Sequence, residues 1–269
     1  MNVPDLPTDR PRRRTEPTDD PAGVTAPQIG DAFGAMLLAA YAGGGPPTIV
    51  HEITERDDGH VSVRDAHYYF APILAGTPDA DLLDTLTGRV LDVGCGAGRH
   101  LTYLKSREVT ALGLDASLGA VQVCARRDLD AVHADIADPP DLGQFDVFLL
   151  LGGNLGLLGT PTNASSLLTT LGRLASPGAR IIAEGIDTSD SGDPIHDSYR
   201  QRNVNLGRHP GQITIRIRHR QQATSWLNLW FPSPSDLSHI TDGTGWRLNE
   251  MRPHAHNLDY HAEFLRDRP

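Results

Sequence analysis

Cysteine is scarce in this sequence, which has only Cys95 and Cys124 among its 269 residues. Two cysteines cannot form the disulfide framework of a small secreted fold, and a chain of this length buries a hydrophobic core without one. The sequence also lacks the spacing of Cys and His that binds a structural or catalytic metal. We therefore expect a protein without a metal ion, in a reducing, cytoplasmic environment.

Basic charge and long apolar runs are scarce as well. The 24 Lys and Arg are outnumbered by 34 Asp and Glu, for a net charge of −10, whereas proteins that track nucleic-acid phosphates normally carry a basic excess. The longest apolar runs, at residues 36–42 and 148–151, fall far short of the roughly 20 residues of a membrane span. The polar, proline-rich beginning does not resemble a signal peptide. Neither a nucleic acid nor a membrane is an expected partner.

Three segments differ in composition along the chain. Residues 1–28 are rich in Pro, Asp, Arg and Thr and poor in apolar side chains, which predicts a disordered tail. Residues 29–88 predict a small N-terminal cap with helices, the first of them capped by Asp31. Residues 89–269 predict the core, with an insertion at about residues 188–231.

From residue 89 onward a short apolar strand, a turn and a helix alternate several times, which indicates a parallel sheet buried on both faces. Strands are expected at Val90–Val93, Ala111–Leu114, Ala131–His133, Val147–Leu151 and Arg180–Glu184. In the last third of the chain the apolar residues alternate with a period of two, which is typical of half-buried strands. The elements expected there are strands around 213–217, 226–231, 246–251 and 260–265, and a helix at 233–240.

The most specific signal is a set of three glycines directly after the first of these strands. Asp92 ends the strand, and Gly94, Gly96 and Gly98 follow at alternate positions. Glycine permits a tight turn and a close approach of the backbone to a ligand, and the helix expected from Arg99 offers free N–H groups to a polar group. The spacing G-x-G-x-G differs from the G-x-G-x-x-G of dinucleotide-binding folds, which disfavours a nicotinamide cofactor.

Acidic residues end the next two strands of the repeat. Asp115 follows the second strand, about 20 residues after the glycines, where a carboxylate can accept both hydroxyls of a ribose. Asp135 follows the third strand and suits an adenine amino group. The fourth strand runs through Leu151 into Gly152. Because parallel strands end at the same edge of a sheet, we expect all of these positions to share one site.

With these motifs, and with the Pro177-Gly178 turn before the fifth strand, residues 89–187 resemble the core of a class I S-adenosylmethionine-dependent methyltransferase. The resemblance implies an α/β fold with a seven-stranded, doubly wound Rossmann-like sheet of order 3-2-1-4-5-7-6 and a small N-terminal cap. It implies S-adenosyl-L-methionine as the methyl donor, with Asp92 near its amino group. The residues that the resemblance places at the cofactor are Asp92, Gly94, Gly96, Gly98, Asp115, Ala116, Asp135, Ile136, Leu151 and Gly152.

The segment after the fourth strand bears on the methyl acceptor. It reads Gly152-Gly153-Asn154, where the family's members that methylate nucleobases carry an Asn/Asp-Pro-Pro-aromatic motif. The chain instead resembles small-molecule methyltransferases of bacterial secondary metabolism, which implies a metabolite or natural-product intermediate as the acceptor and S-adenosylhomocysteine as a product. A protein or peptide methyltransferase and a non-catalytic cofactor-binding protein are the alternatives. Whether carbon, nitrogen or oxygen is methylated stays open, as does the choice between a monomer and a homodimer.

Methyl transfer from a sulfonium needs little acid–base machinery, because positioning and the exclusion of water can supply much of the rate. A base is needed only when the acceptor must lose a proton. Glu184, at the end of the fifth strand, is the candidate base, with a strand-end ion pair as the alternative role. Asn154 is a candidate for orienting the acceptor, with a helix cap as the alternative.

Aromatic residues suggest where the acceptor lies. Tyr68 and Tyr69 precede the core, where the resemblance implies a lid over the cofactor, although a packing cluster is the alternative. Trp226 and Trp230 share one face of an alternating strand. We predict that these two indoles form an apolar wall for the substrate, while the other face of the strand joins the core: Leu227, Leu229 and Phe231.

Overall fold

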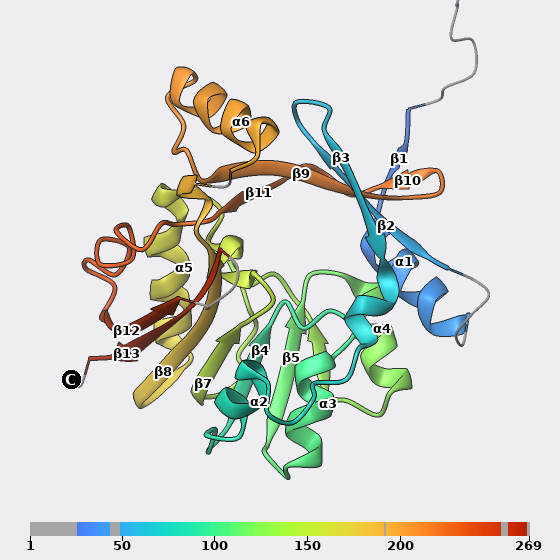
Figure 1. Ribbon diagram of the computed structural model, residues 1–269. Helices are drawn as coiled ribbons and strands as arrows, with labels where there is room; N and C mark the ends of the chain where they lie inside the picture. The colour runs from blue at the N-terminus through green and yellow to red at the C-terminus, as the bar shows by residue number, and fades with distance from the viewer. Residues whose placement is uncertain (1–25, 44–48, 191, 254–257, 268–269) are drawn as a thin grey trace, which may run out of the picture.

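The computed structural model describes residues 26–43, 49–190, 192–253 and 258–267, and these residues form two β-sheets with helices around them (Figure 1). One sheet has seven strands. The second sheet arches over one edge of the first, and Figure 1 shows it in the upper part of the molecule.

Six strands of the seven-stranded sheet run in one direction, and the strand next to one edge runs antiparallel to them. Its strands are β4 (Val90–Val93), β5 (Ala111–Asp115), β6 (Ala131–His133), β7 (Phe145–Leu150), β8 (Ala175–Ile186), β12 (Trp246–Pro253) and β13 (Asp259–Arg266). Their spatial order is β12-β13-β8-β7-β4-β5-β6. Numbered within this sheet and read from β6, the order is 3-2-1-4-5-7-6, which confirms the expected fold.

Helices cover both faces of this sheet. They are α2 (Pro78–Leu83), α3 (Arg99–Ser106), α4 (Leu118–Arg126) and α5 (Pro161–Arg173). Leu83 of α2 and Leu104 of α3 share one apolar cluster with Val147 of β7, whereas Leu168 of α5 shares another with Phe148. Because successive residues of a strand point to opposite faces, the sheet is buried on both sides.

The second sheet combines segments that lie on either side of the seven-stranded core in the sequence. Its strands are β1 (Gln28–Ile29), β2 (His51–Arg56), β3 (Val61–Asp65), β9 (Gln212–His219), β10 (Gln222–Ala223) and β11 (Leu227–Trp230). They are arranged in the order β1-β10-β9-β2-β3, and β11 also pairs with β9. Helix α6 (Pro194–Asn205) precedes β9 and lies above it in Figure 1.

Helix α1 (Ala32–Ala42) joins the two sheets. The Asp31 carboxylate accepts hydrogen bonds from the backbone N–H of Gly34 in α1 and of Gly119 in α4, each at 2.8 Å. One side chain therefore caps two helices. The helices cross so closely that a Cβ atom on Gly119 would lie 2.5 Å from the Cα atom of Gly34. This contact fixes α1, and the second sheet with it, on the seven-stranded core.

Two expectations need correction. Residues 234–245 form a series of turns, where we expected a helix at 233–240. Pro234 has no N–H to donate, and the Asp236 carboxylate accepts from the backbone N–H of Ser233 at 2.7 Å, so a local side-chain bond takes the place of a helical turn. The expected tail reaches into the fold at Gln28, which pairs with Gln222. Residues 1–25 lie outside the described part of the chain.

Candidate functional site at the carboxyl edge of the seven-stranded sheet

The three glycines form a loop between β4 and α3, which we call the glycine loop (residues 94–98). Gly94, Gly96 and Gly98 have φ angles of 71°, 54° and 78°, in the left-handed region that side chains rarely adopt. The N–H of Gly94 donates to the carbonyl of Leu114 at 2.7 Å, which ties the loop to the end of β5. The backbone of the loop is therefore held open at the carboxyl edge of the sheet, without side chains that would block a ligand.

Asp115 lies beside this loop and is buried. Its Oδ2 accepts from the N–H of Gly96 and its Oδ1 from the N–H of Ser117, both at 2.8 Å. Burial raises the pKa of Asp115 to about 6, although the two backbone hydrogen bonds act in the opposite direction. A carboxylate oxygen can accept more than one hydrogen bond, so both oxygens keep room for a ribose hydroxyl.

Asp92 is fully buried, and neither of its carboxylate oxygens receives a hydrogen bond from the described residues. His100 Nδ1 lies 3.5 Å from Asp92 Oδ1, an ion-pair distance. Burial lowers the pKa of His100, but the charge of Asp92 outweighs it and the net shift is upward. A buried carboxylate without donors is costly, and an ammonium group such as that of S-adenosylmethionine supplies the missing donors. The residues at this position therefore fit the cofactor.

The residues expected at the adenine end lie at the same edge, because β5 and β6 are parallel neighbours. Asp135 follows β6 and is exposed, and its Oδ1 accepts a backbone N–H two residues further on at 2.9 Å. Ile136 is half-buried against the main core. The carbonyl of Ala116, next to Asp115, lies 3.0 Å from His133 Nε2. The structure therefore places the carboxyl end of β6 beside the carboxyl end of β5.

Glu184 and Asn154, the two catalytic candidates, hold the backbone of this edge. Glu184 Oε2 accepts from the N–H of Gly152 at 2.6 Å, beside the buried Leu151. Asn154 Nδ2 donates to the carbonyls of Val93 and Gly94 at 2.9 and 3.0 Å. Both side chains lie at the carboxyl edge of the sheet, as expected. Glu184 holds the segment after β7, and Asn154 holds the start of the glycine loop.

Tyr69 lies over the glycine loop, whereas the ring of its neighbour Tyr68 is largely exposed. A Cβ atom built on Gly96 would lie 3.6 Å from Tyr69 Cδ1 and 3.9 Å from Phe33 Cζ, both ordinary contact distances. The Tyr69 hydroxyl donates to Glu52 Oε2 at 2.7 Å. The short 3₁₀ helix η1 (Ala66–Phe70) thus brings an aromatic ring to the loop.

Sequence reasoning missed Glu52, Phe33 and Arg64, which contact Tyr69 or its surroundings. They precede the glycine loop by some 30 to 60 positions. Phe33 lies on α1, which packs on α4, and Glu52 pairs with Arg64 in the hairpin of β2 and β3. The one sign of these contacts in the sequence was Glu52, an acidic residue within the short strand β2.

The predicted tryptophan wall is wrong. Trp230 is 2% exposed, belongs to the main core and donates from Nε1 to His209 Nδ1 at 3.0 Å, so it has no surface for a substrate. Trp226 is 44% exposed, and the Arg216 guanidinium lies 4.6 Å from its ring centroid. The strand was predicted correctly, but Trp230 joins the core that we expected only the other face to join.

Four apolar residues of β9 and β11 take the inward face instead, because directly opposite residues of an antiparallel pair share a face. These residues, which we call the apolar row, are Ile213, Ile215, Leu227 and Leu229. Ile217 continues the alternation and lies opposite Thr54 of β2, so this is also the face of Glu52. Glu52, which binds Tyr69 over the glycine loop, and Arg56, which lies 4.2 Å from the ring centroid of Tyr199 in α6, mark the two ends of this face on β2.

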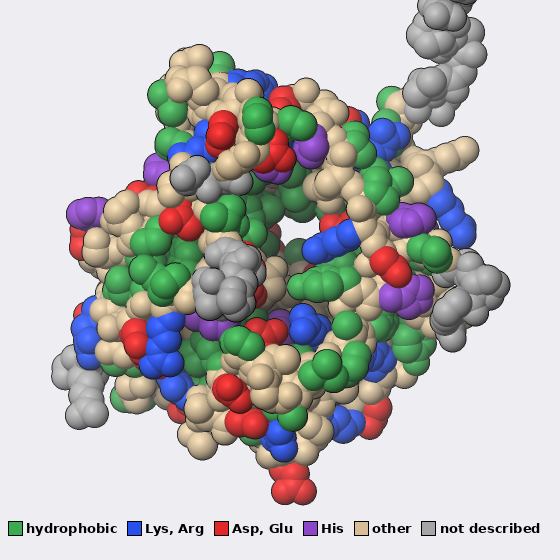
Figure 2. Space-filling model, viewed as in Figure 1, with side chains coloured by type: hydrophobic (Ala, Val, Ile, Leu, Met, Phe, Trp, Pro, Cys, Tyr) green, Lys and Arg blue, Asp and Glu red, His purple; other side chains and the backbone are tan. Residues whose placement is uncertain are grey.

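The space between the two sheets is open. Figure 2 shows the molecule hollowed at its centre, with hydrophobic side chains along the rim beneath the second sheet. None of the four residues of the apolar row is fully buried, and Leu227 is 44% exposed. An uncovered apolar surface beside a cofactor edge suits an apolar ligand.

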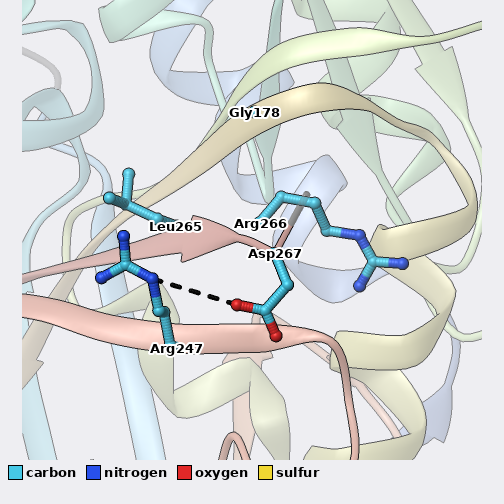
Figure 3. Close-up of a pocket in the computed structure, with 5 residues that line it drawn as sticks. All are labelled: Gly178, Arg247, Leu265, Arg266 and Asp267. Atoms are coloured by element: carbon cyan, nitrogen blue, oxygen red, sulfur yellow. Dashed lines mark ion pairs between the residues drawn. The ribbon is translucent and has the colours of Figure 1, made fainter. Parts of the chain in front are cut away.

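A separate surface pocket of about 360 Å³ lies at the opposite edge of the seven-stranded sheet (Figure 3). Its lining residues are Gly178, Arg247, Leu265, Arg266 and Asp267. They come from the start of β8 and β12 and the end of β13, far from the glycine loop, and Arg247 Nε lies 3.9 Å from Asp267 Oδ1. This pocket contains neither the glycine loop nor the carboxylates at the strand ends, so we place the candidate site at the carboxyl edge of the sheet.

Within the described ranges no group of three or more His, Cys, Asp and Glu could hold a metal ion. No helix in those ranges is both long enough and apolar enough to span a membrane.

Comparison with known proteins agrees with this geometry. Residues 90–178 match the family model of a methyltransferase domain. A 2-heptyl-1-hydroxyquinolin-4(1H)-one methyltransferase from Mycobacteroides abscessus is 36% identical over 84 residues, which cover 28% of this chain and 37% of that relative. The chain therefore spans little more than a third of the length of the curated relative it matches.

Solved structures are similar over more of the chain. A methyltransferase from Bacteroides fragilis, crystallised with S-adenosyl-L-homocysteine, has a TM-score of 0.74 at 20% identity, over 88% of this chain and 95% of that one. The CcbJ methyltransferase from Streptomyces caelestis has a TM-score of 0.56 at 13% identity, over 75% and 95%. At these identities the structural likeness shows the fold alone. Residues 90–178 are similar in sequence to a methyltransferase domain, within a fold that solved methyltransferases share.

Proposed function

We propose that the chain transfers a methyl group from S-adenosylmethionine to a small-molecule acceptor and releases S-adenosylhomocysteine. The observation that carries the proposal is the pair of buried carboxylates, Asp92 and Asp115, on either side of a glycine loop with free approach to its backbone. One of them lacks donors and the other retains capacity to accept. When bound, the cofactor supplies an electrophilic methyl group, and the residues of this chain hold and orient it.

The apolar row supports an acceptor with a flat or hydrocarbon skeleton. It offers four aliphatic side chains on the face of the second sheet that also carries Glu52, the residue that binds Tyr69. The relative from Mycobacteroides abscessus, whose name gives an alkyl hydroxyquinolone as its substrate, is consistent with this class over the matched segment. A peptide would need an exposed groove with polar groups for its backbone, which an apolar surface does not provide.

Glu184 is the base in this proposal when the acceptor is a hydroxyl or an ammonium group. Its Oε2 already holds the N–H of Gly152, so the carboxylate is fixed at the cofactor edge. Asn154 positions the glycine loop through two carbonyls. Acceptors that reach the site unprotonated need no base, and their turnover should survive Glu184→Gln.

The test combines calorimetry with a turnover assay. The protein is titrated with S-adenosylmethionine and then incubated with methyl-labelled cofactor and three acceptor panels: hydroxylated planar aromatics, amino sugars and basic peptides. We expect cofactor binding, and S-adenosylhomocysteine release with the aromatic panel. Absence of cofactor binding by the folded protein would overturn the proposal. Binding without turnover would favour a non-catalytic protein, and turnover with peptides alone would favour the peptide alternative.

A further inference from the structure

The second sheet carries a buried carboxylate that none of the cofactor motifs includes. Glu52 of β2 is 4% exposed. It accepts hydrogen bonds from Arg64 Nε and from the Tyr69 hydroxyl, both at 2.7 Å, and from Thr54 Oγ1 at 3.0 Å. A buried charge is tolerated only with such partners, and the three donors come from β2, β3 and η1.

These contacts fix the Tyr69 ring from several sides. Its hydroxyl touches both Glu52 and Arg64, the Arg64 guanidinium lies 4.9 Å from the ring centroid, and the Phe33 ring meets it edge-on at 5.2 Å between centroids. Burial raises the pKa of Tyr69 far above its ordinary value, and the Glu52 carboxylate acts in the same direction. The phenol therefore stays protonated and keeps donating to Glu52.

The ring connects the second sheet with the cofactor edge. Tyr69 lies over Gly96, and the N–H of Gly96 donates to Asp115. Glu52 thus holds a ring that lies beside Gly96, and Gly96 in turn binds the carboxylate assigned to the ribose. A displacement of the ring would uncover the backbone of the glycine loop to water.

We propose that Glu52 and Arg64 are positioning residues that hold the Tyr69 ring against the glycine loop as one wall of the cofactor site. The inference rests on the proposed function, because the ligand of this site is S-adenosylmethionine or its product. Apolar packing can bury a ring equally well, but it does not fix the hydroxyl in one place. Glu52 is buried, and the Arg64 guanidinium binds both its carboxylate and the Tyr69 hydroxyl, so these groups together select one orientation of the ring.

The same strand offers a matched control. Glu55 lies three residues after Glu52, on the opposite face of β2, and its Oε2 accepts from Arg216 at 2.8 Å and from Arg218 at 3.4 Å. Glu55→Gln therefore weakens a glutamate–arginine pair of the same strand without touching Tyr69. A general loss of cap stability would appear in both variants, whereas a loss specific to the cofactor site would appear only at Glu52.

The experiment measures the dissociation constant for S-adenosylhomocysteine by calorimetry, with a thermal melt of each variant, for wild type, Glu52→Gln, Tyr69→Phe, their double variant and Glu55→Gln. We expect each of the first two substitutions to weaken binding at least tenfold and Glu55→Gln to change it less than twofold. The double variant should be little worse than either single one, because both substitutions weaken the same contact: Tyr69→Phe removes its donor and Glu52→Gln removes the charge of its acceptor. Arg64→Lys, which keeps the charge and loses the fork, should be intermediate.

Folded Glu52→Gln and Tyr69→Phe variants with wild-type affinity would overturn the positioning role, as would equal losses in Glu55→Gln. If Glu52→Gln does not fold, Tyr69→Phe decides, because it removes a single hydroxyl. A wild-type protein that binds no cofactor at all refutes the proposed function instead, so the two failures are distinguishable.

Discussion

At the scale of single residues, the buried carboxylate of Asp115 makes cofactor binding dependent on pH. Its pKa is raised to about 6, and the ribose hydroxyls need the ionised form as acceptor. At pH 5, one unit below this value, affinity for S-adenosylhomocysteine should be about tenfold lower than at pH 7.5, by the linkage of protonation to binding. Calorimetry at the two pH values measures the change.

The matched variant is Asp115→Asn, which should bind at least tenfold more weakly than wild type at pH 7.5 and show no step near pH 6. Folding of the free protein has the opposite dependence at this residue. Because the folded pKa lies above the unfolded value, its contribution to stability decreases as pH rises through about 4 to 6. A wild-type affinity that is equal at pH 5 and pH 7.5 would contradict the assignment.

His100 should affect stability in a different pH range. Its folded pKa is raised by Asp92, so its contribution is full below the ordinary value of about 6.5 and is lost as pH rises through the folded pKa. Asp79 also raises the pKa and Arg99 lowers it. We expect His100→Asn to lower the melting temperature more at pH 6 than at pH 9, and an equal loss at both would contradict the charged pair.

At the scale of elements, the contact between α1 and α4 depends on two glycines. A Cβ atom on Gly119 would lie 2.5 Å from the backbone of Gly34, and a main chain cannot turn aside as a flexible side chain does. Gly119→Ala should destabilise the fold by about 1–3 kcal/mol, as overpacking does. Gly30→Ala is the control, because a Cβ atom there meets nothing within 4 Å. Denaturant titrations should separate the two, and equal stabilities would show that α1 can shift on α4 at little cost.

The two tryptophans of the β11 segment should behave differently. Trp230 is buried in the core, so Trp230→Ala should cost about 3–5 kcal/mol of stability. Trp226 lies under Arg216 and is partly exposed, so Trp226→Ala should cost less than about 1 kcal/mol. Thermal melts of both variants provide the measurement. A severe loss in Trp226→Ala alone would contradict the placement of Trp226 at the surface.

Element prediction succeeded where a strand is directly followed by a motif. The strands at Val90–Val93 and Ala131–His133 have the expected bounds, and the glycine loop lies between β4 and α3 as its spacing predicted. Alternation at residues 226–231 identified a strand, but periodicity cannot say which of two apolar faces meets the core. The turns at 234–245 depend on a side-chain bond of Asp236, which competes with the helix that the apolar spacing favoured.

At the scale of the whole molecule, the apolar row makes a prediction about the acceptor. Leu229→Asn places an amide on this surface, so we expect the KM for a planar aromatic acceptor to rise at least fivefold, with the dissociation constant for the cofactor unchanged within about twofold. Asn228→Ala, on the opposite face of β11, is the control. A rise in the cofactor dissociation constant with unchanged KM would place the acceptor elsewhere.

The arrangement of the second sheet was beyond sequence reasoning for a physical reason. Its strands pair across the whole length of the core, as in the contact between Glu55 and Arg216, which are 161 residues apart. No local period encodes such a partner. The common edge of the motif residues was predictable because consecutive parallel strands bring their ends together. Glu52 and Arg64 lie instead on the hairpin of β2 and β3, and Phe33 lies on α1, and no local pattern connects these elements with the glycine loop.

The separation of β2 and β9 along the chain has a consequence for synthesis on the ribosome. The hairpin of β2 and β3 leaves the exit tunnel before β9, the strand that pairs with β2, has been translated. Translation proceeds at about 5–20 residues per second, so β2 waits on the order of ten seconds for this partner. During that interval Val61 and Val63 of β3, which remain exposed even in the finished fold, lie beside an unpaired strand. The nascent chain is therefore most vulnerable to aggregation, and most dependent on chaperones, while the residues of the cofactor edge are being translated.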